Sequence, residues 1–152
     1  MITDNEVSKT LKAANLFQIS YIIAIFIYVI LLYIVKNYIE LWIFPSGDPT
    51  LNLIEIILII VSAIVLALGY FLPRLAVNWY KRNLQALYSF HFTRSTLFLT
   101  IGILGLILGI LGSGWQVSLP LLMVAILALI FTFPTEGKRR KMIEASNIED
   151  AI

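Results

Sequence analysis

The chain has 152 residues, of which 60% are hydrophobic and 13% are charged, and its formal net charge is +2. An average soluble domain is about 25% charged, so this composition excludes an ordinary water-soluble protein and indicates a membrane protein. The absence of cysteine excludes disulfides, thiolate metal sites and cysteine nucleophiles, and the single histidine excludes a bis-histidine haem within one chain.

Four apolar segments are long enough to cross about 30 Å of hydrocarbon as helices. They cover residues 14–35, 53–72, 95–112 and 117–133. The first is too long for the core of a secretory signal and has no cleavage site behind it, so we predict a retained span after a short N-terminal segment, residues 1–13. The flanks carry aromatic residues typical of membrane interfaces: Tyr38, Trp42, Tyr70, Trp79, Tyr80 and Trp115.

The basic residues predict how the chain is oriented. Ten of the eleven Lys and Arg residues lie in the N-terminal segment, in the connection 73–94 or in the tail 134–152, and only Lys36 lies in the two other connections. The positive-inside rule therefore places both termini and the middle connection in the cytoplasm. We predict a single all-α domain in the cell (inner) membrane, a four-helix bundle of two antiparallel hairpins.

The polar residues of the first span lie near its cytoplasmic end. Asn15, Gln18 and Tyr21 are spaced by three and share a helix face, and Tyr28 follows Tyr21 by seven residues. Two interpretations are open: hydrogen bonds to neighbouring helices, or a polar pathway or ligand contact within the membrane.

The outer connection, residues 36–52, contains the turn sequence "PSGDP", and Asp48 with Pro49 resembles the N-cap and first residue of the second span. Glu55 is the only acidic residue inside a predicted span, and such residues suggest function by default. It lies only ~10 Å along the helix from Asp48, so it is either a boundary carboxylate or an ion or proton site used together with the polar face of the first span.

The middle connection, residues 73–94, is aromatic and basic. Its spacing of Tyr80, Leu84, Leu87 and Tyr88 predicts a short helix at the cytoplasmic interface. We expect His91 to be an interfacial side chain rather than a ligand. The tail is basic and then mildly acidic. Its basic run either contacts anionic lipid headgroups or only fixes the topology; the candidate headgroup contacts in the two segments are Lys81, Arg82, Lys138, Arg139, Arg140 and Lys141.

The third span carries four glycines, Gly102, Gly105, Gly109 and Gly112, at spacings of three, four and three residues. This spacing places them on one stripe of a helix, and the middle two form a GxxxG pair, which favours close helix contact. The stripe can pack within the chain, form a seam with another chain or line a pore. The turn 113–116 is so short that the third and fourth spans must be antiparallel neighbours.

Residues 84–114, "LQALYSFHFTRSTLFLTIGILGLILGILGSG", resemble a hairpin of small bacterial four-helix membrane proteins and, more distantly, the proteolipid (c-type) subunits of rotary ATPases. In both, an arginine stands near the helix entry, as Arg94 does here, and a glycine- and leucine-rich stretch follows. The carboxylate that binds the ion in proteolipids would fall near Leu99 or Thr100. The resemblance therefore implies a double hairpin and no proton translocation.

The sequence contains no Walker loop, HExxH or GxSxG motif. We therefore predict no enzyme, no cofactor or metal site and no nucleic-acid partner. The expected function is that of a non-catalytic, multi-pass membrane protein that acts through helix–helix association, as an accessory subunit or a homo-oligomer, with lipids as further partners. The alternative is a small transporter or channel that uses Glu55.

Overall fold

The computed structural model describes residues 4–39, 43–45, 48–80 and 84–133, and in these segments all regular structure is helical. The helices are α1 (Asp4–Ile34), α2 (Pro49–Tyr80), α3 (Leu84–Leu111) and α4 (Trp115–Phe131). A π-helical turn, η1 (Val35–Ile39), extends α1. The predicted all-α class is confirmed for the described part of the chain.

Three stretches are long and apolar enough to cross a membrane: Lys12–Tyr38, Pro49–Phe71 and His91–Leu111. The fourth helix, α4, is apolar but has only 17 residues, about 25 Å at 1.5 Å per residue. It begins and ends two residues earlier than the predicted span. Because α4 is short, its C-terminal end lies among the other helices.

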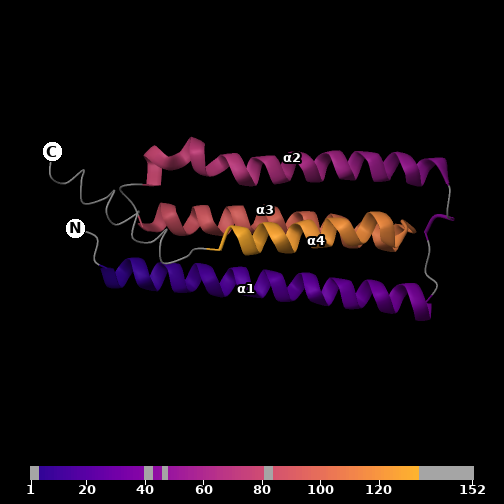
Figure 1. Ribbon diagram of the computed structural model, residues 1–152, viewed down its shortest axis with the longest axis horizontal. Helices are drawn as coiled ribbons and strands as arrows, with labels where there is room; N and C mark the ends of the chain where they lie inside the picture. Colours follow the sequence, from indigo (N-terminus) through magenta and orange to yellow (C-terminus); the bar gives the residue numbers. More distant parts are fainter. Residues whose placement is uncertain (1–3, 40–42, 46–47, 81–83, 134–152) are drawn as a thin grey trace.

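The middle connection differs from the expected loop. The structure continues α2 to Tyr80, through Pro73, and begins α3 at Leu84, so most of the segment extends the two neighbouring helices. The ribbon of α2 changes direction in its last turns (Figure 1), as expected near a proline, which removes a helical hydrogen bond. The predicted headgroup contacts in this connection, Lys81 and Arg82, and those of the tail lie outside the described residues.

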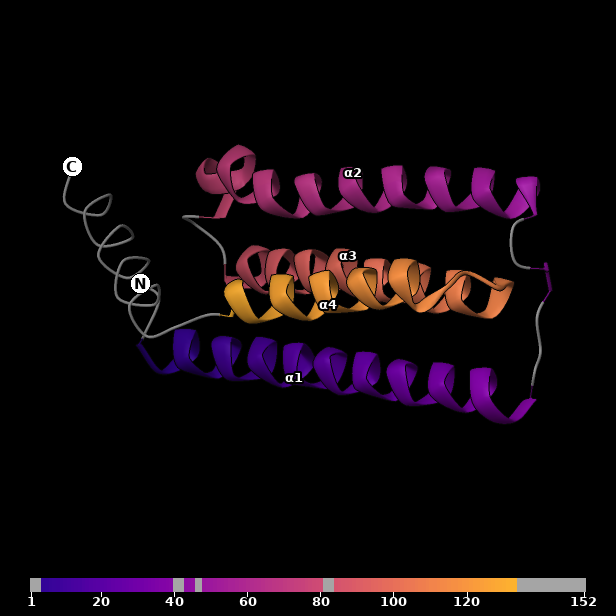
Figure 2. The ribbon, with the colours of Figure 1, turned by 45° about the vertical axis from the view of Figure 1, so that its right-hand side comes forward.

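The central helix is α3, which packs against α1, α2 and α4. Figures 1 and 2 show α1 and α2 on opposite sides of the α3–α4 pair. The third and fourth helices form the antiparallel hairpin that the short turn predicts. The first two helices are also antiparallel, but each packs chiefly against α3 and not against the other.

The first and third helices run in the same direction with a constant register. Ile25 contacts Gly102, Leu32 contacts Gly109, and Lys36 bonds to Ser113. The members of each pair are 77 positions apart, so the two helices advance together along their whole shared length. This register places the polar residues of α1 level with those of α3.

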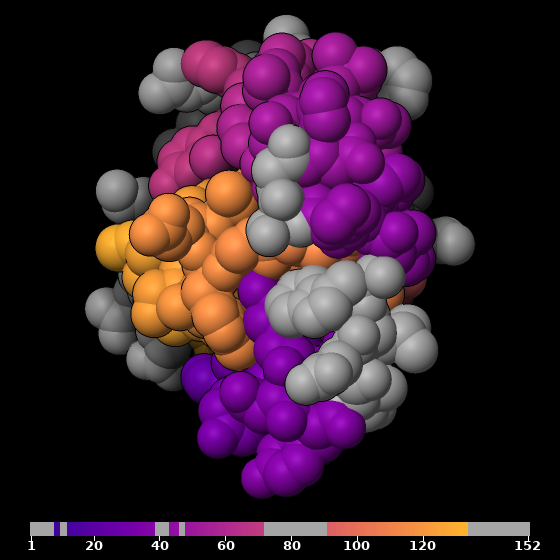
Figure 3. Space-filling model, turned by 90° about the vertical axis from the view of Figure 1, so that its right-hand side faces the viewer, coloured from indigo at the N-terminus to yellow at the C-terminus, as the bar shows by residue number. Residues whose placement is uncertain are grey.

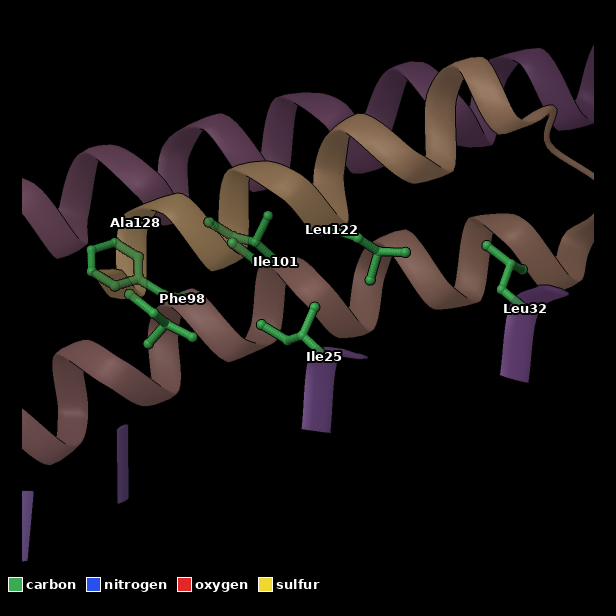
Figure 4. Packing of buried hydrophobic residues seen from close by; sticks show 8 residues of the cluster. Ile25, Leu32, Phe98, Ile101, Leu122 and Ala128 are labelled. Atoms are coloured by element: carbon green, nitrogen blue, oxygen red, sulfur yellow. The ribbon is translucent and has the colours of Figure 1, made fainter. Parts of the chain in front are cut away.

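The core is an apolar cluster contributed by α1, α3 and α4. Figure 4 shows its middle, where side chains of the three helices interdigitate. The buried members are Ile25, Leu32, Phe98, Ile101, Leu122, Ala125, Ala128 and Leu129. The second helix contributes a narrow face, with Leu51, Ser62 and Gly69 buried, and exposes large apolar side chains around the rest of its surface.

Candidate functional site

The structure does not bring the predicted polar site together. Gln18 lies in the middle of α1, level with the C-terminal end of α4, whereas Glu55 bonds to Ser113, whose carbonyl oxygen accepts a hydrogen bond from Lys36 in η1. The distance along α1 from Gln18 to Lys36 is ~27 Å, and the apolar core fills the space between. There are two separate polar clusters, one at the C-terminal end of α4 and one at the α3–α4 turn.

The first group, which we call the cap cluster, consists of Asn15, Gln18, Arg94 and Thr132. Gln18 Nε2 donates to Leu129 O and, at 3.1 Å, to Thr132 Oγ1. Arg94 Nη2 donates to Thr132 O at 2.6 Å. Carbonyls in the last turn of a helix lack a partner within the helix. The cap cluster therefore closes the end of α4 with side chains from α1 and α3.

The need for this cap follows from the short length of α4. Its last turn ends level with Gln18, which is fully buried, and Arg94, which is 8% exposed. A carbonyl that finds neither water nor a protein donor within a membrane protein costs several kcal/mol. A positively charged guanidinium at a helix C-terminus also interacts favourably with the negative end of the helix dipole. Of the two interpretations of Gln18, the structure shows the hydrogen bond between helices.

The remaining polar residues of the predicted α1 face have different surroundings. The Tyr21 hydroxyl lies 3.3 Å from Thr96 Oγ1 and joins α1 to α3. Tyr28 is half-buried and packs against the apolar core. Asn15 Oδ1 is buried and has no hydrogen-bond partner within the described segments, and neither has Gln18 Oε1.

The histidine is not the interfacial side chain that we expected. His91 is 4% exposed, because α3 already begins at Leu84 and carries the residue as part of a packed helix. It lies one turn before Arg94 on the same face. The error came from treating residues 73–94 as a connection, which made every side chain in it a surface group.

The second group, which we call the turn cluster, consists of Lys36, Glu55, Ser113 and Trp115. Ser113 Oγ donates to Glu55 Oε1 at 2.6 Å. Lys36 Nζ donates to Ser113 O at 2.7 Å and lies 4.7 Å from the centre of the Trp115 ring, within cation–π range. Figure 3 looks at this end of the molecule and shows the α3–α4 turn between α1 and α2. The turn cluster thus ties three elements together.

Backbone hydrogen bonds cap the C-terminal end of α3 beside the turn cluster. Gly112 has a φ of 119°, and Ser113 N donates to Leu108 O at 3.0 Å, as at a glycine-terminated helix. The outer connection caps α3 in turn, because Phe44 N donates to Leu111 O at 3.0 Å. A Cβ on Gly112 would lie 2.5 Å from Phe44 O, so the position requires glycine.

The start of α2 matches the prediction for Asp48 and Pro49. Pro49 is the first residue of the helix. Thr50 N donates to Asp48 Oδ1 at 2.7 Å, which satisfies one of the backbone donors that the first turn leaves without a partner. Glu55 lies two turns further along and is partly exposed.

The glycine stripe faces α1 and α4 of the same chain. A Cβ on Gly102 would lie 3.0 Å from Ile25 Cγ1, and one on Gly105 would lie 3.1 Å from Ser118 O. A Cβ on Gly109 would overlap Leu32 Cδ1. Of the three interpretations of the stripe, these contacts correspond to packing within the chain.

Sequence reasoning missed Arg94, Ser113 and Thr132 as bonding residues. Arg94 was assigned to the topology and to the helix entry of the resembling hairpins, because it lies directly before the predicted span 95–112 and not inside it. Ser113 and Thr132 gave no comparable signal, because their partners come from distant parts of the chain.

No group of histidine, cysteine, aspartate or glutamate side chains in the described segments is arranged to hold a metal ion. No protein-family model matches the chain, and neither the curated proteins nor the solved structures include a significantly similar one.

Proposed function

We propose that the protein is a non-catalytic, multi-pass membrane protein that acts by helix–helix association, either as an accessory or assembly subunit of a larger complex or as a homo-oligomer. The observation that carries this proposal is that the polar side chains of both clusters form hydrogen bonds within the chain. The cap cluster closes α4, the turn cluster ties three elements together, and the space between them is apolar. The outer faces of α1 and α2 remain for contacts with other molecules.

These outer faces are broad and apolar. On α1 and α2, several large side chains are at least 50% exposed: Ile23, Phe26, Ile30, Ile57, Ile60 and Ile64. Lipid chains are as apolar as such residues, so association here depends on shape and on van der Waals contact. Because the glycine stripe is already occupied within the chain, the proposed contact surface moves from α3 to α1 and α2.

The cysteine-free sequence permits a direct test by crosslinking in native membranes. Single cysteines at Ile30, Ile57 and Ile64 are labelled with a maleimide that carries a photoreactive benzophenone, which links to partners with or without cysteine, and the adducts are identified by mass spectrometry. We expect adducts at a subset of these positions, on one helix face. Leu122→Cys, at a fully buried position, is the control that should give none. Absence of adducts at every exposed position of α1 and α2 contradicts the proposal.

We further propose that the protein resides in the cell membrane with both termini in the cytoplasm. The start of α1 and the end of α4 lie at the same end of the molecule (Figure 1). Lys9 and Lys12 lie at that end of α1, while Lys36 is part of the turn cluster. This distribution of charge supports the orientation, which requires α4 to cross the membrane despite its 17 residues.

The second candidate is transport, supported by one observation: Glu55 is a carboxylate within the candidate span Pro49–Phe71. Flux of protons or monovalent cations into liposomes, measured for the wild type and for Glu55→Gln, tests it. Flux that the substitution abolishes supports transport. Flux that is absent, or that persists in the variant, leaves the association proposal in place. The resemblance to proteolipid hairpins stays a prediction.

A further inference from the structure

The orientation of the Gln18 amide is fixed by its partners. Leu129 O can only accept, so the amide nitrogen must face α4. Thr132 Oγ1 donates its own proton to Ala128 O at 2.6 Å, so it too accepts from Gln18. Both amide protons of Gln18 are therefore used, and Oε1 lies on the other side of the amide group as an acceptor.

Two buried acceptors thus lie on one face of α1. Gln18 is fully buried, and Asn15 lies one turn nearer the start of the helix. Gln18 Oε1 and Asn15 Oδ1 have no donor within the described part of the chain. Buried amide oxygens almost always have a partner, in protein or in water, because an unsatisfied acceptor is costly.

We propose that Asn15 Oδ1 and Gln18 Oε1 bind water in the cap cluster. A water molecule offers two donors, which matches two acceptors one helical turn apart. A cation is disfavoured, because the Arg94 guanidinium bonds to the same residue as Gln18 and places a positive charge nearby. Lys12, one turn before Asn15, is exposed, so the path from bulk water is short.

This hydration gives the cap cluster a second role. Arg94 lies within the candidate span His91–Leu111 and is almost completely buried. Charged groups inside a membrane are stabilised where water reaches them. The proposed water site lies beside this charge. It extends no further into the molecule than Ile25 and Phe98, where the apolar core begins. The site is therefore a hydrated inlet closed at its inner end, which is independent of the proposed association.

Nuclear magnetic resonance of the full chain with ¹⁵N-labelled glutamine and isoleucine tests the site. We expect magnetisation transfer from water to the side-chain amide protons of Gln18. Gln116, which is exposed, is the positive control, and the buried backbone amide of Ile25 is the negative control. Transfer to Gln116 without transfer to Gln18 overturns the proposal.

A pair of variants then tests the second acceptor. Asn15→Leu removes the oxygen while keeping the number and branching of the side-chain heavy atoms, and should abolish the transfer to Gln18, whereas Asn15→Asp keeps an oxygen and should retain it. Unchanged transfer in Asn15→Leu contradicts a site shared by the two residues. If Asn15→Leu is not recovered folded, the comparison of wild type with Asn15→Asp and the two amide controls still decides whether water reaches Gln18.

Discussion

A single residue, Gly109, allows α1 and α3 to approach each other closely. Its missing side chain makes room for Leu32, which is fully buried and cannot swing into open space. In a membrane, where helices gain little from the hydrophobic effect, such close contact supplies much of the attraction between them. The side chain of Leu32 and the absence of one at Gly109 therefore act as a pair.

Gly109→Ala should destabilise the fold by about 1–3 kcal/mol, the usual cost of overpacking a well-packed site. Unfolding by titration with a denaturing detergent measures the loss. The matched control is Gly114→Ala, because a Cβ there has no neighbour nearer than Gln116 N at 3.9 Å. The double variant with Leu32→Ala should lose less than the sum of the single losses. Equal stability of Gly109→Ala and Gly114→Ala would contradict the contact.

The bond of Ser113 to Glu55 needs an acceptor and not a charge. Glu55→Gln keeps an oxygen for the Ser113 hydroxyl, so we expect little change in stability. Glu55→Leu leaves the hydroxyl without its acceptor at a fully buried residue and should cost about 1–3 kcal/mol. The same detergent titration compares the two. If Glu55→Gln is as harmful as Glu55→Leu, the negative charge itself stabilises the turn cluster.

At the scale of the element, α4 depends on its neighbours for its C-terminal end. Gln18→Leu removes the donor to Leu129 O and Thr132 Oγ1 and should cost about 1–3 kcal/mol. Hydrogen exchange should become faster in the last turn of α4 and remain unchanged in the middle of α3. Gln116→Leu, at an exposed position, is the control. Unchanged exchange at the end of α4 would show that Gln18 does not cap the helix.

The centres of the helices could be predicted from the sequence, while several of their ends could not. Hydropathy and spacing locate the apolar segments, and Asp48 with Pro49 marks a start that depends only on local chemistry. The continuation of α2 past Pro73 depends on the surroundings, and proline normally argues against it. Where capping groups come from other helices, as at α4, local sequence carries no signal for the end.

For the candidate sites too, features set by local spacing could be predicted, whereas contacts between helices could not. The spacing of the four glycines identifies their common face, but the residues opposite them follow only from the parallel register of α1 and α3. Gln18 and Arg94 are 76 positions apart in the sequence and meet at Thr132 because of that register. The polar face of α1 and Glu55 were grouped by residue type, and the structure separates them because α2 begins at the opposite end.

At the scale of the whole molecule, the arrangement places α3 at the centre and leaves α1 and α2 as flanks. The third helix has the largest buried share of the three candidate spans, 39%, against 17% for α1 and 11% for α2. The least enclosed helices are therefore those that meet lipid or other chains. The two polar clusters lie at the two ends of α4, and the apolar core lies between them.

The orientation of the whole molecule can be tested with two single cysteines. Ser8→Cys lies near the start of α1, and Gly114→Cys lies at the exposed α3–α4 turn at the other end. If the proposed orientation is right, a membrane-impermeant maleimide applied to intact cells labels Gly114→Cys and labels Ser8→Cys only after permeabilisation, because the positive-inside rule assigns the end with the basic residues near Ser8 to the cytoplasm. The reverse pattern contradicts the orientation. A reporter fused to the C-terminus adds the test of α4: if its 17 residues cross the membrane, the reporter must lie on the side of Ser8, and a reporter on the side of Gly114 would show that only three helices cross.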